Sequence, residues 1–259
     1  TFHGAVTLLG KLDISGVKEV IFKQAVTVAG IVTVYAADTV TLEADASLKA
    51  DGEITIIVDD NDDDDLAGAV IDILGDIESK VKIRIYSGDE SAKITITGDV
   101  VEATFVDVWG GLAADKFIIS QSPDDGFMFV QGKGEADDFQ ISAPNELYAP
   151  IIIAGDYAEL LVDEQNNLLS VHSMMLGMGG ADIIKTVGSK YIVAIGGAAK
   201  DIIEITTTSG ISAILGDEGR AEFSASRMLE RIESVGTLGG VDTITTDNGD
   251  DVIIGGIAA

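Results

Sequence analysis

Gly177-Met-Gly-Gly-Ala-Asp182-Ile-Ile is the first of four related segments between residues 177 and 256. The others read Gly196-Gly-Ala-Ala-Lys-Asp201-Ile-Ile, Gly239-Gly-Val-Asp242-Thr-Ile and Asn248-Gly-Asp-Asp251-Val-Ile-Ile-Gly255-Gly256. Glycine permits a sharp corner and a close approach of stacked backbones, and aspartate can bond the backbone amides of such a corner. The stretch therefore predicts repeated corners, each followed by a short apolar β-strand.

The corners recur at two spacings. Asp115 and Asp137 are 22 residues apart, and Asp182 and Asp201 are 19 apart, which fits a coil of roughly twenty residues. A longer repeat also exists: the Gly155-Asp156 pair returns 61 positions later, and the Leu168 and Val171 pair returns at the same offset as Leu229 and Ile232. We interpret this as a unit of about 60 residues, made of three coils, that occurs almost twice in 151–259.

The preceding part of the chain alternates apolar and polar residues with a period of two. Pulses such as Val26-Thr-Val28, Ile54-Thr-Ile-Ile-Val58 and Lys93-Ile-Thr-Ile-Thr97 are short and are followed by Gly, Asp or small polar residues. Few Asn-Gly or Asp-Gly pairs mark tight hairpins, so stacked coils are favoured over a sandwich. A helical turn at 225–232 is considered, but the aligned 168–171 segment favours a strand there.

These patterns predict an all-β protein, a right-handed parallel β-solenoid of about a dozen coils. Residues 1–108 form one segment, with alternating strands and an acidic loop at 59–65. Residues 109–259 continue the same solenoid with glycine-aspartate corners and the longer repeat. The chain starts without Met and stops at the beginning of another corner, so we expect it to be an internal piece of a longer protein.

Composition excludes several classes of function. The 16 Lys and Arg against 44 Asp and Glu give a formal net charge of −28, which does not suit a nucleic-acid partner. No apolar run approaches the ~20 residues of a membrane helix, so no membrane insertion is expected. Cysteine is absent, so neither disulfides nor thiolate chemistry can occur.

The corners resemble the RTX (haemolysin-type) nonapeptide family, G-G-x-G-x-D-x-U-x, and the alternating half resembles the haemagglutinin-type β-helices of long secreted adhesins. The resemblance implies a β-roll that holds calcium between consecutive turns. The nine-residue spacing that this requires occurs between Asp242 and Asp251. The candidate calcium ligands are accordingly Asp242, Asp247, Asp250 and Asp251. The residues expected to build corners are Gly110, Gly111, Asp115, Gly177, Gly180, Asp182, Gly196, Gly197, Asp201, Gly239, Gly240, Gly255 and Gly256.

No catalytic residue is assigned. The four arginines fall in no recognisable motif, His172 lacks a nucleophile context, and Trp109 is expected to pack without forming a sugar-binding platform. We therefore expect a non-catalytic structural segment of a long extracellular or cell-surface protein, such as a fibre subunit, surface filament or adhesin shaft. Its expected partners are neighbouring repeats or subunits of the same fibre, together with surface glycans or cells. A calcium-dependent secreted RTX-type domain that supports adhesion is the first alternative, and a polysaccharide-acting β-helix enzyme is the second.

Overall fold

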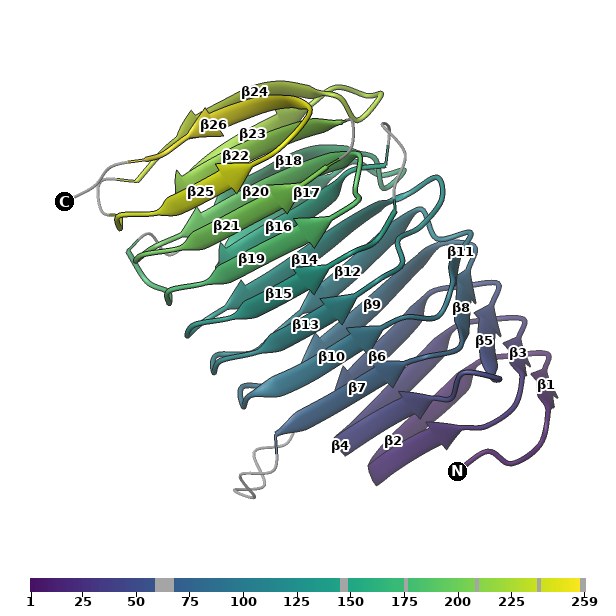
Figure 1. The fold of residues 1–259 in the computed structure, drawn as a ribbon. Coiled ribbons are helices and arrows are strands. Elements are labelled where there is room, and N and C mark those ends of the chain that lie inside the picture. The colour runs from purple at the N-terminus through teal and green to yellow at the C-terminus, as the bar shows by residue number, and fades with distance from the viewer. Residues whose placement is uncertain (59–67, 145–148, 175–176, 208–209, 237–238, 257–259) are drawn as a thin grey trace.

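The computed structural model describes residues 1–58, 68–144, 149–174, 177–207, 210–236 and 239–256, and within these ranges the protein is all-β (Figure 1). No helix occurs there, so the described residues include no helix that could cross a membrane. Strand pairing is parallel in every sheet except one small sheet of four strands. The predicted all-β class and the dominance of parallel pairing are confirmed.

Within the described residues the largest sheet has 17 strands, which form two parallel ladders. The long strands β2 (Leu12–Phe22) and β4 (Val32–Leu42) contribute to both ladders, because the first half of β4 pairs with β6 and its second half pairs with β7. The first ladder continues through β7 (Ala69–Ile73), β10 (Ala92–Ile96), β13 (Lys116–Ile119), β15 (Asp138–Ile141), β19 (Ile183–Val187), β21 (Ile202–Thr206) and β25 (Thr243–Thr246). The second continues through β6 (Ile54–Val58), β9 (Lys82–Ser87), β12 (Phe105–Trp109), β14 (Phe127–Lys133), β16 (Ile151–Asp156), β20 (Tyr191–Gly197), β22 (Ile211–Asp217) and β26 (Asp250–Ile254).

A short third sheet accompanies only the first part of the chain. It contains β1 (Val6–Leu8), β3 (Val26–Val28), β5 (Ser47–Ala50), β8 (Asp76–Ser79) and β11 (Val100–Val101), all paired in parallel. The two large ladders do not stop where this sheet ends, because β12 pairs with β9 and β14 in the second ladder and β13 pairs with β10 and β15 in the first. The change of sequence character near residue 109 therefore coincides with the loss of the third sheet, within continuous ladders.

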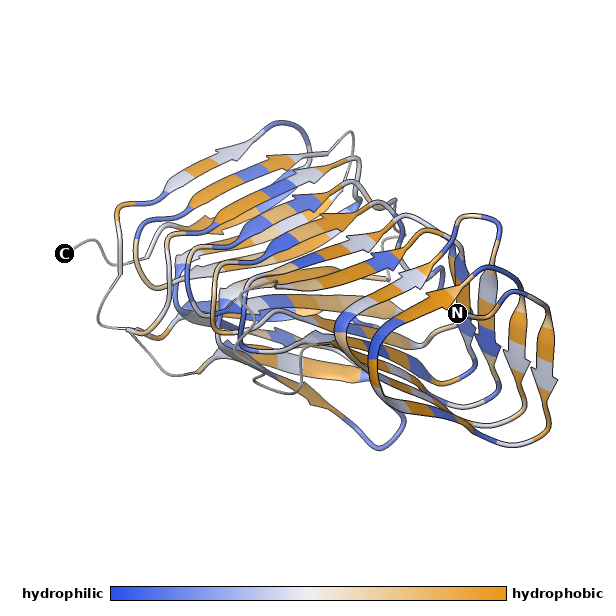
Figure 2. Ribbon diagram, turned by 90° about the horizontal axis from the view of Figure 1, so that it is seen from below, coloured by the Kyte–Doolittle hydropathy of each residue, from blue (hydrophilic) through white to orange (hydrophobic). Residues whose placement is uncertain are grey.

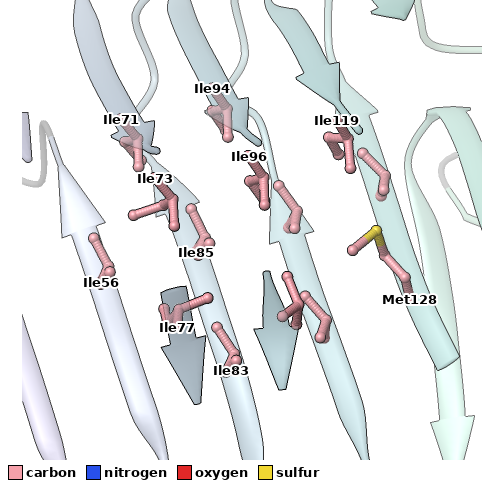
Figure 3. Packing of buried hydrophobic residues seen from close by; sticks show 14 of the residues in the cluster. Ile56, Ile71, Ile73, Ile77, Ile83, Ile85, Ile94, Ile96, Ile119 and Met128 are labelled. Atoms are coloured by element: carbon pink, nitrogen blue, oxygen red, sulfur yellow. The ribbon is translucent and has the colours of Figure 1, made fainter. Parts of the chain in front are cut away.

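The main core lies between the ladders and is built from the inward phase of the alternating strands. Ile73, Ile96 and Ile119 occupy one register position of the first ladder and stack directly on one another (Figure 3). Such stacking of identical β-branched side chains suits a pleated surface that is buried on one side. The outward phase carries polar residues, and Figure 2 shows hydrophobic and hydrophilic segments following one another along the strands.

A second hydrophobic core lies on the outer face of the second ladder. From β14 to β22 the strands of this ladder are buried on both faces, as the all-buried patterns of β16 and β20 show, whereas the terminal strand β26 is largely exposed. Their outward residues pack against a four-stranded antiparallel sheet that contains β17 (Ala158–Val162), β18 (Leu168–Ser173), β23 (Gly219–Phe223) and β24 (Leu229–Ser234). We call this the covering sheet. Two-sided burial explains why these strands read as continuous apolar runs instead of alternating.

The covering sheet is made of two hairpins that were not predicted. Strands at 168–171 and 229–232 were expected and are confirmed as parts of β18 and β24, but they lie in hairpins and not in the parallel ladders. Their turns begin at Asp163 and Ser224 and contain Asn166 and Arg227 at positive φ, 61 residues apart. The unit of about 60 residues therefore comprises two passes along each ladder and one hairpin, and the expectation of three coils was wrong.

Candidate functional site

Five aspartates form a row along one edge of the first ladder. Each immediately precedes a strand of that ladder, and in-register parallel pairing places the residues before successive strands directly above one another. We call this set the corner row; its members are Asp115, Asp137, Asp182, Asp201 and Asp242. The corner prediction for Asp115, Asp182 and Asp201 thus corresponds to one continuous feature, to which Asp137 and Asp242 also belong.

Hydrogen bonds connect the members of the corner row from strand to strand. The backbone N–H of Asp115 donates to Oδ1 of Asp137 at 2.7 Å, and the N–H of Asp137 donates to Oδ1 of Asp182 at 2.7 Å. The same bond joins Asp182 to Asp201 at 2.8 Å and Asp201 to Asp242 at 2.9 Å. Each carboxyl group therefore satisfies a backbone donor that corner geometry would otherwise leave unpaired.

The second oxygen of most corner carboxyl groups is buried and unpaired. Oδ2 of Asp137, Asp182, Asp201 and Asp242 has no hydrogen-bond partner among the described residues, whereas Oδ2 of Asp115 accepts the Gly111 N–H at 2.6 Å. An ionised carboxylate in such a place would lack solvation. A buried oxygen of this kind needs either a proton that it can donate onward or a cation.

Burial raises the pKa of every member of the row. It raises the pKa of Asp115 to about 6, those of Asp137 and Asp201 to about 8, and that of Asp182 to about 10. The charges of neighbouring carboxylates add to the rise at Asp137, Asp182 and Asp201, and the pKa of Asp242 is raised for the same reasons. In the absence of a bound cation, these pKa values place a proton on Asp137, Asp182 and Asp201 at neutral pH.

Glycine is required beside each corner carboxyl group because there is no space for a Cβ. A Cβ on Gly155 would lie 2.0 Å from Oδ2 of Asp182 and 2.2 Å from the carbonyl oxygen of Gly196. The same crowding pairs Gly110 with Asp115, Gly132 with Asp137, Gly196 with Asp201 and Gly216 with Asp242. Of these glycines, Gly110 and Gly196 were predicted as corner residues, and the other three were not.

Two further acidic residues, Asp156 and Asp217, account for most of the remaining predicted glycines. Asp156 accepts the N–H groups of Gly180 and Ala198 at 3.0 and 2.5 Å, and Asp217 accepts the Gly240 N–H at 2.9 Å. A Cβ on Gly197 would collide with Asp156, and a Cβ on Gly239 or Gly256 would collide with Asp217. Asp156 and Asp217 are 61 residues apart, so the longer repeat preserves this arrangement as well.

The last three predicted corner glycines have separate environments. Gly111 lies against the Gly88 carbonyl, where a Cβ would be 1.8 Å from the oxygen, and Gly177 donates its N–H to Oε1 of Glu218. Nothing lies within 4 Å of a Cβ built on Gly255. Spatial crowding therefore explains Gly111 but gives no reason for glycine at 255.

The four candidate calcium ligands are not brought together. Asp242 precedes β25 and Asp247 follows it, so an extended segment of five residues, about 16 Å, separates them. Oδ1 of Asp247 accepts the Thr207 N–H at 2.7 Å, and Asp250 and Asp251 lie in β26. Calcium needs six or more oxygen ligands at about 2.3–2.6 Å, so these four residues do not fit one shared ion.

No group of three or more His, Asp or Glu side chains arranged to hold a metal ion is found in the part of the chain that the structure describes. The acidic run at 59–65 lies outside the described residues.

A separate cluster of polar and aromatic side chains lies on the outer face of β9 and β12. Arg84 is in register with Asp107, and Tyr86 with Trp109, so two rows of the ladder align four side chains. Sequence reasoning considered Arg84 and Trp109 individually and assigned them no role. The signal was available, because the pulses at 82–86 and 105–109 are 23 residues apart, close to one pass of the chain, and both alternate in phase.

Comparisons with models of protein families, with curated proteins and with solved structures gave no match for this chain. The function must therefore be inferred from the geometry of the chain itself.

Proposed function

We propose that this chain is a segment of a parallel β-solenoid that serves as a non-catalytic structural shaft in a long extracellular repeat protein. The observation that carries the proposal is the corner row, in which acidic side chains bond one pass of the chain to the next. Residues used in this way hold strands in register and support extension by addition of further repeats.

The number of stacked strands gives the length of the proposed shaft segment. The first ladder contains nine strands in the described part of the chain, fewer than the dozen coils expected, and eight inter-strand spacings of about 4.8 Å give a length of roughly 38 Å. Each unit of about 60 residues adds two strands to each ladder and one hairpin to the covering sheet. A longer protein of this type would therefore grow by about 10 Å per unit.

Two measurements test the proposal. Small-angle X-ray scattering of the chain should give the profile of a particle whose length matches the stacked strands. Immunogold labelling of thin sections of the source cells with antibodies against the chain should mark surface structures that extend away from the cell. Label confined to the cell interior would refute the extracellular shaft.

A calcium-dependent secreted domain is the second candidate. The observation that favours it is the set of buried, unpaired Oδ2 atoms in the corner row, because a cation could satisfy them in place of protons. Thermal unfolding in calcium and in EDTA separates the two, since a cation-dependent row would lose stability on chelation.

A further inference from the structure

A groove of about 500 Å³ lies where the covering sheet ends and the outer face of the second ladder becomes exposed. Its floor is formed by Arg84 and Tyr86 of β9 and by Asp107 and Trp109 of β12. Its wall is formed by the edge strand β17 and by Met174. The volume falls within the range of ~300–1,000 Å³ that is typical of small-ligand sites.

The floor of the groove is held in a fixed arrangement. The Tyr86 hydroxyl donates a hydrogen bond to Oδ2 of Asp107 at 3.0 Å, and the Tyr86 and Trp109 rings stack with their centroids 4.6 Å apart. The Lys133 ammonium group lies 4.7 Å from the Trp109 ring centroid. Because Tyr86 and Lys133 both contact the indole ring of Trp109, we expect a ligand to meet its edge.

Three polar atoms of the floor have unused hydrogen-bonding capacity. Nε of Arg84, Oδ1 of Asp107 and Nε1 of Trp109 are buried without a hydrogen-bond partner among the described residues. The indole N–H lies near Asp107 without the geometry of a hydrogen bond to it. Two N–H donors and one carboxyl acceptor match a hydroxyl group, which can accept from one and donate to another.

The opposite wall of the groove is apolar apart from Glu159. Leu160, Val162 and Met174 line it together with Ala158, and Tyr157 adds an aromatic ring. A ligand must therefore offer hydroxyl groups on one edge and C–H groups on another. Sugar rings have this amphipathic character, and tyrosine and tryptophan suit such ligands because they combine an apolar body with a polar tip.

A peptide strand is a poorer fit to this groove. Pairing with the edge strand β17 would need its free backbone groups, but the Gln131 amide donates to the carbonyl oxygens of Asp156 and Ala158 at 3.2 and 3.0 Å. This side chain occupies the start of the edge that a peptide would use.

Charge distinguishes between kinds of carbohydrate. The Arg84 guanidinium is paired at 2.9 Å with Glu53, which also contacts Lys82 at 3.4 Å, and Glu159 on the wall adds a second carboxylate. The whole chain carries a formal net charge of −28, which repels polyanions. We propose that the groove binds a short stretch of a neutral, hydroxyl-rich oligosaccharide.

Trp109 is the sole tryptophan of the chain, so its fluorescence reports on the groove directly. The probes are cellohexaose, xylohexaose and maltohexaose, with polygalacturonate as the acidic comparison, titrated into the purified chain at pH 7. At least one neutral oligosaccharide should change the Trp109 emission saturably, and polygalacturonate should not.

Two variants and a matched control locate the binding. Asp107→Asn keeps the size of the floor residue but alters its hydrogen bonding, and Tyr157→Ala opens the wall; each should weaken binding about tenfold or more, consistent with the loss of a buried hydrogen bond or of aromatic contact. Asp72→Asn makes the same charge change on the outer face of β7, where Asp72 pairs with Lys93 at 3.4 Å, and should bind like the wild type. Far-UV circular dichroism confirms folding of each variant.

Three outcomes would overturn the assignment. They are the absence of any response to the three neutral sugars, a response to polygalacturonate alone, and binding that folded Asp107→Asn and Tyr157→Ala variants leave unchanged.

Discussion

The corner row predicts that this protein is most stable in acid, and Asp182 is the best place to test it. Asp182 is 1% exposed, its Oδ1 accepts the Asp137 N–H, and its Oδ2 is unpaired beside the Gly196 carbonyl. Burial raises the pKa of Asp182 to about 10 from an ordinary value of 3.8. Between these values the folded protein holds a proton on this group that the unfolded chain has released.

The direction of the pH effect follows from this difference. Stability falls wherever the folded state binds more protons than the unfolded state as pH rises, so the contribution of Asp182 is full below about pH 4 and is lost as pH rises toward about 10. Each such carboxyl group contributes a slope of about 1.4 kcal/mol per pH unit within its window. Asp137 and Asp201 have windows that end near pH 8, so they steepen the decline between pH 4 and pH 8.

Two substitutions separate the role of the proton from that of the side chain. Asp182→Asn keeps the acceptor for the Asp137 N–H and supplies permanent N–H donors in place of the carboxyl proton, so it should retain stability at pH 5 and flatten the pH dependence. Asp182→Ala leaves a buried backbone donor unpaired, so it should be about 1–3 kcal/mol less stable than Asp182→Asn at every pH.

The assay is urea unfolding followed by circular dichroism at pH 5, 7 and 9 for the wild type and both variants. The wild-type free energy of unfolding should fall with pH, and the slope of Asp182→Asn should be smaller by about 1.4 kcal/mol per pH unit. Stability that rises between pH 5 and pH 8, or an Asp182→Asn variant as unstable as Asp182→Ala, would refute the protonated row.

Three further predictions concern packing and metal dependence. Gly155→Ala should lower the free energy of unfolding by about 2–4 kcal/mol, because the added Cβ would collide with Asp182. Gly255 has open space around it, so Gly255→Ala should change the free energy of unfolding by less than about 0.5 kcal/mol in the same urea assay. Leu168→Ala removes a fully buried side chain from the inner face of the covering sheet and should cost about 2–5 kcal/mol. Its neighbour Leu169, 44% exposed, should tolerate alanine, and urea unfolding of the two variants checks the contrast. EDTA should leave the melting temperature unchanged at pH 5, where protons satisfy the corner row, and a fall at that pH would favour the calcium alternative.

The ladders and corners were predictable because their determinants are local. Alternation with a period of two fixes which side chains of a strand such as Ile54–Val58 point inward, and a glycine-rich segment that ends in aspartate before an apolar run marks a corner. The spacing of 19 residues between Asp182 and Asp201 then gives the length of one pass. What this spacing could not give is the function of the aspartate oxygens, because a metal-binding corner and a hydrogen-bonded corner use the same residues.

The covering sheet could not be read in the same way, although its signals are present. Its turns use Asp163, whose Oδ1 accepts the N–H groups of Gln165 and Asn167, instead of an Asn-Gly or Asp-Gly pair. The other signal was the loss of alternation at Ile151–Asp156 and Tyr191–Gly197, which indicates burial on both faces and hence a second layer. The loss of alternation therefore predicts a second layer over these strands.

The corner row and the covering sheet depend on each other through the longer repeat. A hairpin inserted in the sequence after a strand of the second ladder lengthens one pass from about 20 to about 40 residues. Asp182 and Asp242 nevertheless reach the corner row and accept the N–H groups of Asp137 and Asp201. The corner row therefore restores register after each insertion, and this lets the outer face be covered in one part of the chain and left open in another. The groove at Asp107 and Trp109 lies at the boundary between these parts, before the first hairpin begins at Ala158. Its position follows from where the hairpins start, so a ligand site there would be fixed by the same repeat that extends the proposed shaft.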